Sequence, residues 1–265
     1  MANLFFRSLL RLSLTGALAG GLSWLGFSSR ALALTTDQIV TKLNQIPVFM
    51  VHDAQGEQLK AISESDQKVQ APVVFLDGPT AAEVVQRLQS QGQQAKIDVV
   101  DLGTIYQQSA ADGTAGPLLY FPINTELTTA EKLQPGFKGV PLFIPRRGQT
   151  DSYLPFVQGN QVSLPMFFSR DDLQTYLDWV FKDNPNGAKE IVVEVRSLEW
   201  LLGAMAAAKD TTMNNQLQQI RLFPSTKVLD FLNTIQTQQQ SQPQAPASAQ
   251  PQNRSQPRPA AQPRP

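Results

Sequence analysis

Only one side chain of this 265-residue sequence could act as an imidazole base, because His52 is its single histidine. The sequence contains no cysteine, which excludes a disulfide framework, a cysteine nucleophile and a thiolate-ligated metal or iron–sulfur site. A lone histidine also argues against a metal site built from several imidazoles. His52 follows an apolar run and precedes a turn, which is typical of a polar residue at a strand end. We therefore expect neither a catalytic triad nor a bound metal.

Paired carboxylates could hydrolyse a substrate without histidine. Asp98 lies close to Asp101, and Asp171 precedes Asp172. The second pair begins a predicted helix, where acidic side chains stabilise the positive end of the helix dipole, and the first pair flanks a predicted strand. No H-E-x-x-H, G-x-S-x-G, G-x-G-x-x-G or P-loop pattern occurs. The sequence favours a protein that is not an enzyme and needs no cofactor, with a secreted carboxylate-dependent hydrolase as an alternative.

The formal charge of zero is a sum over three unlike segments. Residues 1–33 combine arginines, an apolar stretch and Ala31-Leu32-Ala33, which predicts a cleavable signal peptide with Leu34 as the first mature residue; an uncleaved membrane anchor is the alternative. Residues 238–265 consist almost entirely of Gln, Pro, Ala, Ser and Arg, a composition that predicts disorder. The body between them carries 16 basic and 22 acidic side chains, a net charge of −6 that disfavours nucleic acid as a partner.

An internal repeat with an offset of roughly 95 residues organises the body. Five short segments recur in the same order: Leu34-Thr35-Thr36 as Leu127-Thr128-Thr129, Ile46-Pro47-Val48-Phe49 as Val140-Pro141-Leu142-Phe143, Ala71-Pro72-Val73-Val74-Phe75 as Leu164-Pro165-Met166-Phe167-Phe168, Ile97-Asp98-Val99 as Val193-Glu194-Val195, and Phe121-Pro122 as Phe223-Pro224. We therefore expect two similar lobes from a duplication, residues 34–126 and residues 127–237, in a pseudo-twofold arrangement. The second lobe ends in a closing helix.

Strand and helix signals alternate along both halves of the body. Apolar runs predict strands at residues 48–51, 73–76, 97–100, 118–121, 142–144, 153–157, 166–168, 191–195 and 220–223. Apolar stripes at helical spacing follow Thr35, Asp77, Leu102, Ser169, Leu198 and Val228. Helices that return the chain between strands, together with a hairpin in each half, predict mixed sheets of the α/β (α+β) class.

The segment Tyr153-Leu154-Pro155-Phe156-Val157 is hard to bury completely, because successive residues of a strand point to opposite faces. One face would pack on the core and leave the other open, and an open apolar patch marks an interaction site. An extended polypeptide could bind there or pair with a sheet edge. The expected polypeptide-binding residues are Tyr153, Leu154, Phe156, Phe143 and Phe121.

Several segments resemble the twenty-two-kilodalton Tic subunit family, which includes a chloroplast import component of the intermembrane space and its cyanobacterial relatives. The resemblance covers about Leu34 to Gln236. It rests on Ile46-Pro47-Val48-Phe49 with Asp53-Ala54-Gln55-Gly56, on Pro72-Val73-Val74-Phe75, on Val99-Val100-Asp101-Leu102-Gly103-Thr104-Ile105-Tyr106 and on Val140-Pro141-Leu142-Phe143. The bacterial type of signal is similar to that of the cyanobacterial branch.

The resemblance implies a two-lobed molecule with apolar pockets that acts as a chaperone-like factor in protein transport and outer-membrane biogenesis. The implied partners are unfolded or translocating polypeptides and an outer-membrane barrel assembly pore, and the basic tail is compatible with peripheral membrane association. The implied location is the periplasm, with the thylakoid lumen as the alternative. A carrier of a small apolar ligand is a further alternative, which an enclosed cavity rather than an open groove would favour.

Overall fold

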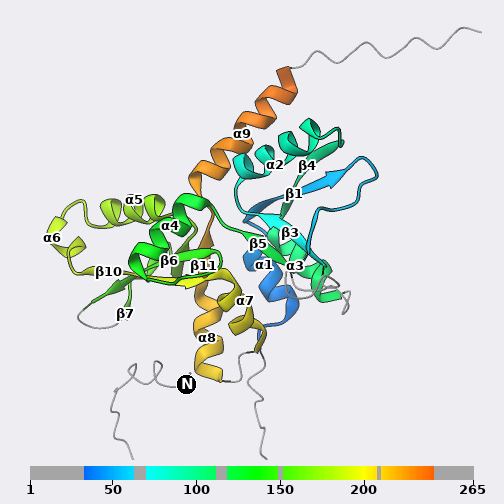
Figure 1. The fold of residues 1–265 in the computed structure, drawn as a ribbon. Coiled ribbons are helices and arrows are strands. Elements are labelled where there is room, and N and C mark those ends of the chain that lie inside the picture. The colour runs from blue at the N-terminus through cyan, green and yellow to red at the C-terminus, as the bar shows by residue number, and fades with distance from the viewer. Residues whose placement is uncertain (1–32, 63–69, 112–117, 149–151, 208–209, 242–265) are drawn as a thin grey trace, which may run out of the picture.

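Two mixed β-sheets, one from each half of the chain, form the centre of this α/β protein (Figure 1). The structure is a computed structural model and describes residues 33–62, 70–111, 118–148, 152–207 and 210–241. The first sheet contains β1 (Pro47–Asp53), β2 (Lys60–Ile62), β3 (Gln70–Phe75), β4 (Ala95–Asp101) and β5 (Leu119–Phe121). The second contains β6 (Pro141–Arg147), β7 (Ser152–Tyr153), β8 (Phe156–Gln158), β9 (Gln161–Phe167), β10 (Ile191–Ser197) and β11 (Ile220–Phe223).

The described helices lie around these two sheets. They are α1 (Thr36–Leu43), α2 (Gly78–Ser90), α3 (Leu102–Ala111), α4 (Asn124–Leu133), α5 (Arg170–Val180), α6 (Pro185–Ala188), α7 (Leu198–Ala207), α8 (Thr211–Gln219) and α9 (Thr226–Ser241). None of the helices within the described ranges is both long and apolar enough to cross a membrane.

The two sheets share one pairing scheme. In the first, β1 pairs antiparallel with β4 and β3, and β5 joins β3 in parallel. In the second, β6 pairs antiparallel with β10 and β9, and β11 joins β9 in parallel. In each sheet, a short segment between the two central strands forms hydrogen bonds with both of them. In the first sheet, the Leu59 N–H donates to the Val51 carbonyl and the Leu59 carbonyl accepts from the Val73 N–H. In the second sheet, β7 pairs with β6 and β8 pairs with β9. The halves therefore match strand by strand.

Alternation along the strands divides the core into one shared cluster and two outer clusters. On β1, Val48 and Met50 belong to the cluster shared by both sheets, whereas Phe49 and Val51 belong to the outer cluster of the first sheet. β6 follows the same alternation on the second sheet. Buried residues of α1, α3, α7 and α8 complete the shared cluster.

Each outer cluster combines the helix that follows the second long strand of its own sheet with a helix that follows the last strand of the other sheet. On the first sheet, α2 packs beside α9, whose Val228 and Phe231 belong to this cluster. On the second sheet, the cluster contains α5 and also α4, whose Ala130 is fully buried. α4 follows β5, and α9 follows β11, so the chain crosses between the sheets at both points (Figure 1).

Most of the predicted elements are present, but one predicted strand is divided and three helices were not predicted. The predicted strand at residues 153–157 is two short strands, because Pro155 has no N–H for a ladder and Leu154 instead donates to the Pro145 carbonyl at 2.9 Å. α4, α6 and α8 were not predicted, and the predicted lobe boundary between residues 126 and 127 falls inside α4. Leu127-Thr128-Thr129 consequently lies in the middle of a helix, unlike its proposed counterpart at the start of α1.

Ala31 lies outside the described residues, as does most of the tail at residues 242–265. Ala33 is half-buried, and Leu34 is buried in the shared cluster, where its N–H donates to the Met205 carbonyl at 3.2 Å.

Candidate functional site

An open groove of about 650 Å³ lies on the second half of the molecule, where β8, α5 and the start of α9 meet. We call it the aromatic groove. Its walls are formed by Phe156, Val157, Gln158, Phe167, Asp172, Thr175, Tyr176, Trp179, Phe223, Pro224 and Thr226. Five elements, β8, β9, α5, β11 and the start of α9, therefore supply one surface.

Helical periodicity of α5 supplies one wall of the aromatic groove. The helix begins at the N-cap Ser169, whose hydroxyl accepts from the Asp172 N–H at 3.3 Å. Tyr176 and Trp179 line the groove together with Asp172, one and two turns further along the helix. Leu173 and Leu177 point instead into the outer cluster of the second sheet. The packing of these leucines fixes the direction in which the groove wall faces.

The aromatic rings of the groove contact one another in a continuous series. Phe167 stacks on Phe223 with a centroid distance of 4.8 Å, and Phe156 lies 5.1 Å from Phe223 and 5.9 Å from Tyr176. Tyr176 in turn lies 6.4 Å from Trp179. The series runs from the buried Phe167 to Trp179, which is 63% exposed. It presents the largest aromatic side chain to solvent at its outer end.

Polar contacts hold the rings in place. The Tyr176 hydroxyl donates to the Pro155 carbonyl at 2.9 Å, and burial raises the pKa of Tyr176. The Arg221 guanidinium lies about 5 Å from the ring centroids of Phe156 and Phe223 and donates to Gln158 Oε1 at 2.6 Å. These contacts preorganise the groove without filling it.

The structure brings one of the five predicted binding residues into the groove. Phe156 lines it, whereas Phe143 is fully buried and Leu154 is 4% exposed, so both support the groove from beneath. Tyr153 is half-buried against the shared cluster, and Phe121 is exposed on the first half, 5.2 Å from Phe75. Tyr176, Trp179 and Phe223 were not predicted as binding residues.

The aromatic walls distinguish the second half from the first. Asp77 and Ser169 are the N-caps of α2 and α5, and this match aligns Val84 with Tyr176 and Arg87 with Trp179. The ring pair Phe75 and Phe121 corresponds to Phe167 and Phe223, but α2 adds no aromatic residue at these two positions.

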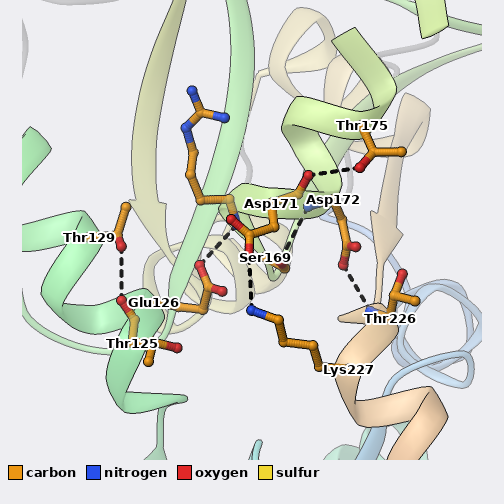
Figure 2. Close-up of polar contacts among 10 residues, drawn as sticks. Thr125, Glu126, Thr129, Ser169, Asp171, Asp172, Thr175, Thr226 and Lys227 are labelled. Atoms are coloured by element: carbon orange, nitrogen blue, oxygen red, sulfur yellow. Dashed lines mark hydrogen bonds and ion pairs between the residues drawn. The ribbon is translucent and has the colours of Figure 1, made fainter. Parts of the chain in front are cut away.

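Carboxylates next to the groove tie three helices together (Figure 2). Glu126 of α4 is 4% exposed and accepts from the Arg170 N–H at 2.9 Å, and burial raises its pKa. Asp171 accepts from Lys227 Nζ at 2.8 Å, and Asp172 accepts from the Thr226 N–H at 2.8 Å. The carboxylates thus join the N-termini of α5 and α9 to α4, and Glu126 was not anticipated.

Asp98, from the other predicted carboxylate pair, contacts side chains of its own sheet. Asp98 lies 3.1 Å from His52 Nδ1 and 3.4 Å from Lys96 Nζ. Asp172 is the one carboxylate among the residues that line the aromatic groove. Within the described ranges, no three histidine, aspartate or glutamate side chains gather closely enough to hold a metal ion.

The comparisons with known proteins agree on one family and one fold. A model of the Tic22-like family matches residues 21–229. The solved structure of Anabaena Tic22, described as protein transport, is 24% identical with a TM-score of 0.60 and covers 76% of this chain and 97% of its own. Tic22 from Plasmodium falciparum is 16% identical with a TM-score of 0.56 and covers 76% of this chain and 98% of its own. At these identities the two structures show the fold alone, and no curated protein matches the sequence.

Proposed function

This chain belongs to the Tic22-like family, a family of protein transport, and from that membership we propose that it is a chaperone-like factor that binds unfolded or translocating polypeptides. The polypeptide binds in the aromatic groove. The exposed end of the ring series, with Trp179 63% exposed, is the observation that carries the proposal.

The groove supports binding of apolar side chains energetically. An aromatic side chain buries about 150–250 Å² when covered, so covering the exposed part of Trp179 removes about 125 Å² from water. At about 25 cal/mol per Å² this contributes about 3 kcal/mol before the entropic losses of binding. A gain of this size suits transient contacts with many sequences, which a transport chaperone requires.

The shape and lining of the groove favour a polypeptide over the two alternatives. A carrier of a small apolar ligand would enclose its cargo, whereas this groove is open along α5 and β8. A hydrolase would place two carboxylates across a cleft, whereas Asp172 alone lines the groove and accepts from a backbone N–H. We therefore propose no enzymatic activity.

The proposed location is the periplasm, where an outer-membrane barrel assembly pore would be the partner and outer-membrane biogenesis the process. The signal pattern at residues 1–33 and the fold shared with Anabaena Tic22 support it. The thylakoid lumen remains the alternative compartment.

We also infer that the two halves descend from one duplicated unit. The common pairing scheme supports this, as do the equivalent N-caps Asp77 and Ser169. Cross-strand contacts to a carboxylate recur as well: His52 Nδ1 lies 3.1 Å from Asp98 on the first sheet, and Arg146 lies 3.3 Å from Glu194 on the second. On this reading the second copy specialised in binding, because only α5 contributes Tyr176 and Trp179.

A pair of tryptophan substitutions tests the proposed function. Trp179→Ser removes the exposed end of the ring series, and Trp200→Ser is the matched control, since Trp200 is 40% exposed on α7 and does not line the groove. Binding of a fluorescent, permanently unfolded protein would be measured by anisotropy. We expect Trp179→Ser to weaken binding about tenfold or more, while Trp200→Ser changes it less than about twofold. Equal effects of both variants, or no binding by the unsubstituted protein, would overturn the proposal.

A further inference from the structure

We propose that residues 254–265 at the end of this same chain occupy the aromatic groove and compete there with other polypeptides. The inference rests on the proposed function in taking the groove as a polypeptide-binding site. It adds that a specific segment of this chain occupies the groove and thereby limits the binding of other polypeptides.

The composition of the segment suits an aromatic groove. It contains Pro257, Pro259, Pro263 and Pro265 within nine residues. Proline-rich segments populate the extended polyproline II helix before binding, so they lose little conformational entropy when they dock between aromatic rings. Trp179 at the rim and Phe156 and Tyr176 below it provide such rings.

Charge favours the same pairing. The segment carries Arg254, Arg258 and Arg264 and no acidic residue, whereas the body has a net charge of −6. On α5, Asp172 is the carboxylate that lines the groove. Arg221 lies against Phe156 and Phe223 on the opposite wall, so the carboxylate of the groove is on the α5 side and the guanidinium is on the β11 side.

The length of the chain allows the segment to reach the groove. α9 begins at Thr226 on the groove wall and runs away from α5 past α2, which places Ser241 about 24 Å from the groove at 1.5 Å per residue (Figure 1). An extended chain covers this distance in about eight residues at about 3.1 Å each. Residues 242–249 would span the return, and the residues beyond them would reach the groove.

Attachment to the same chain makes even weak docking effective. A short flexible connection gives an effective concentration of about 1 mM. If the free segment bound with a dissociation constant of about 0.1 mM, it would fill about nine tenths of the grooves. A client would then bind about tenfold more weakly than it binds an empty groove.

Photo-crosslinking in the full chain tests where the segment lies. Benzoylphenylalanine replaces Trp179 in one variant and Trp200 in a control variant, and both are irradiated at low micromolar concentration and after tenfold dilution. Mass spectrometry should find intramolecular crosslinks from position 179 to residues 254–265, unchanged on dilution, and none from position 200. No crosslink to this segment, or crosslinks between copies that fade on dilution, would overturn the inference.

A second measurement separates this inference from the proposed function. The triple variant Pro257→Ala, Arg258→Ser and Pro259→Ala should bind the unfolded client about tenfold more tightly than the unsubstituted chain. The control Pro243→Ala, Gln244→Ser and Pro246→Ala, which alters only the return segment, should not. Unchanged client affinity in the triple variant would overturn the inference while leaving the proposed function intact. If no variant binds client, the proposed function fails, and the crosslinks alone decide whether the segment docks.

Discussion

Replacing Gly78 with alanine should loosen α9 from the first sheet. Gly78 is the first residue of α2 and is buried. An added Cβ would collide with the ring of Phe231 on α9 and would lie 2.9 Å from Phe49 Cζ. Phe231 packs edge-on to Phe49 with a centroid distance of 5.7 Å, so any shift of its ring also weakens this contact. The substitution therefore tests whether α9, which follows the last strand of the second sheet, packs on the first sheet.

The expected loss follows from three contributions. Overpacking a well-filled site lowers the free energy of unfolding by about 1–3 kcal/mol, and losing an edge-to-face ring contact lowers it by about 0.5–1.5 kcal/mol. The smaller backbone entropy of alanine in the unfolded chain offsets about 0.5–1 kcal/mol. We expect a net destabilisation of about 2 kcal/mol.

A matched glycine in another helix gives the opposite sign. Gly203 lies within α7, and nothing lies within 4 Å of a Cβ built on it. Gly203→Ala should therefore stabilise the protein by about 0.5–1 kcal/mol. Urea unfolding followed by circular dichroism measures both variants under one condition.

A double-mutant cycle assigns the loss to the ring. In a Phe231→Ala background, Gly78→Ala should be much less destabilising, because the ring that obstructs the Cβ is gone, and the coupling free energy should exceed about 1 kcal/mol. If Gly78→Ala and Gly203→Ala shift the free energy alike, or the coupling is near zero, α9 does not pack on α2 in solution and our account of the outer cluster is wrong.

Two further predictions concern ionisable side chains that form hydrogen bonds with backbone groups. Because burial raises the pKa of Glu126, the folded state favours its neutral form; this stabilisation is present below the usual glutamate pKa and is lost as pH rises through the raised value. Glu126→Gln keeps an acceptor for the Arg170 N–H but does not ionise. The free energy of unfolding of this variant, relative to that of the unsubstituted protein, should therefore rise between about pH 4 and about pH 8. A difference in urea unfolding that stays constant over this range would contradict the prediction. Lys42 donates to the carbonyls of Gln218 and Ile220 at 2.6 and 2.9 Å, and Lys42→Met should lower the unfolding free energy by about 1–3 kcal/mol; a neutral result would show that solvent satisfies both carbonyls.

Local sequence signals predicted the elements well because those signals act over a few residues. Capping at Asp77 and Ser169 and the apolar stripes of α2 and α5 needed no knowledge of the partner surface. Such local signals could not predict which sheet α4 and α9 pack against. An apolar stripe says that one face of a helix is buried, but it does not say which sheet covers that face, and either sheet offers an apolar outer surface.

Among the residues that line the aromatic groove, only Phe156 was predicted as a binding residue, for a related reason. Phe143, Leu154 and Phe156 are all apolar and close in sequence, yet Phe143 and Leu154 are buried and Phe156 reaches the groove. Their exposure depends on Pro155, which divides the predicted strand, and on rings contributed by α5 and β11. The apolar stripe predicted after Ser169 contains Tyr176 but not Trp179, and the convergence of α5, β8 and β11 on one surface is a tertiary property.

The exchange of α4 and α9 bears on the history of the molecule. A single copy of the proposed ancestral unit would send its last helix away from its own sheet and leave the outer face of that sheet exposed. Two copies could cover each other by exchanging this helix, so the proposed duplication implies an ancestor that was a homodimer with a swapped element. On the same proposal, gene fusion would convert this intermolecular exchange into an intramolecular one. Because the two copies in one chain can change independently, one copy could carry Val84 and Arg87 while the other acquired an aromatic surface.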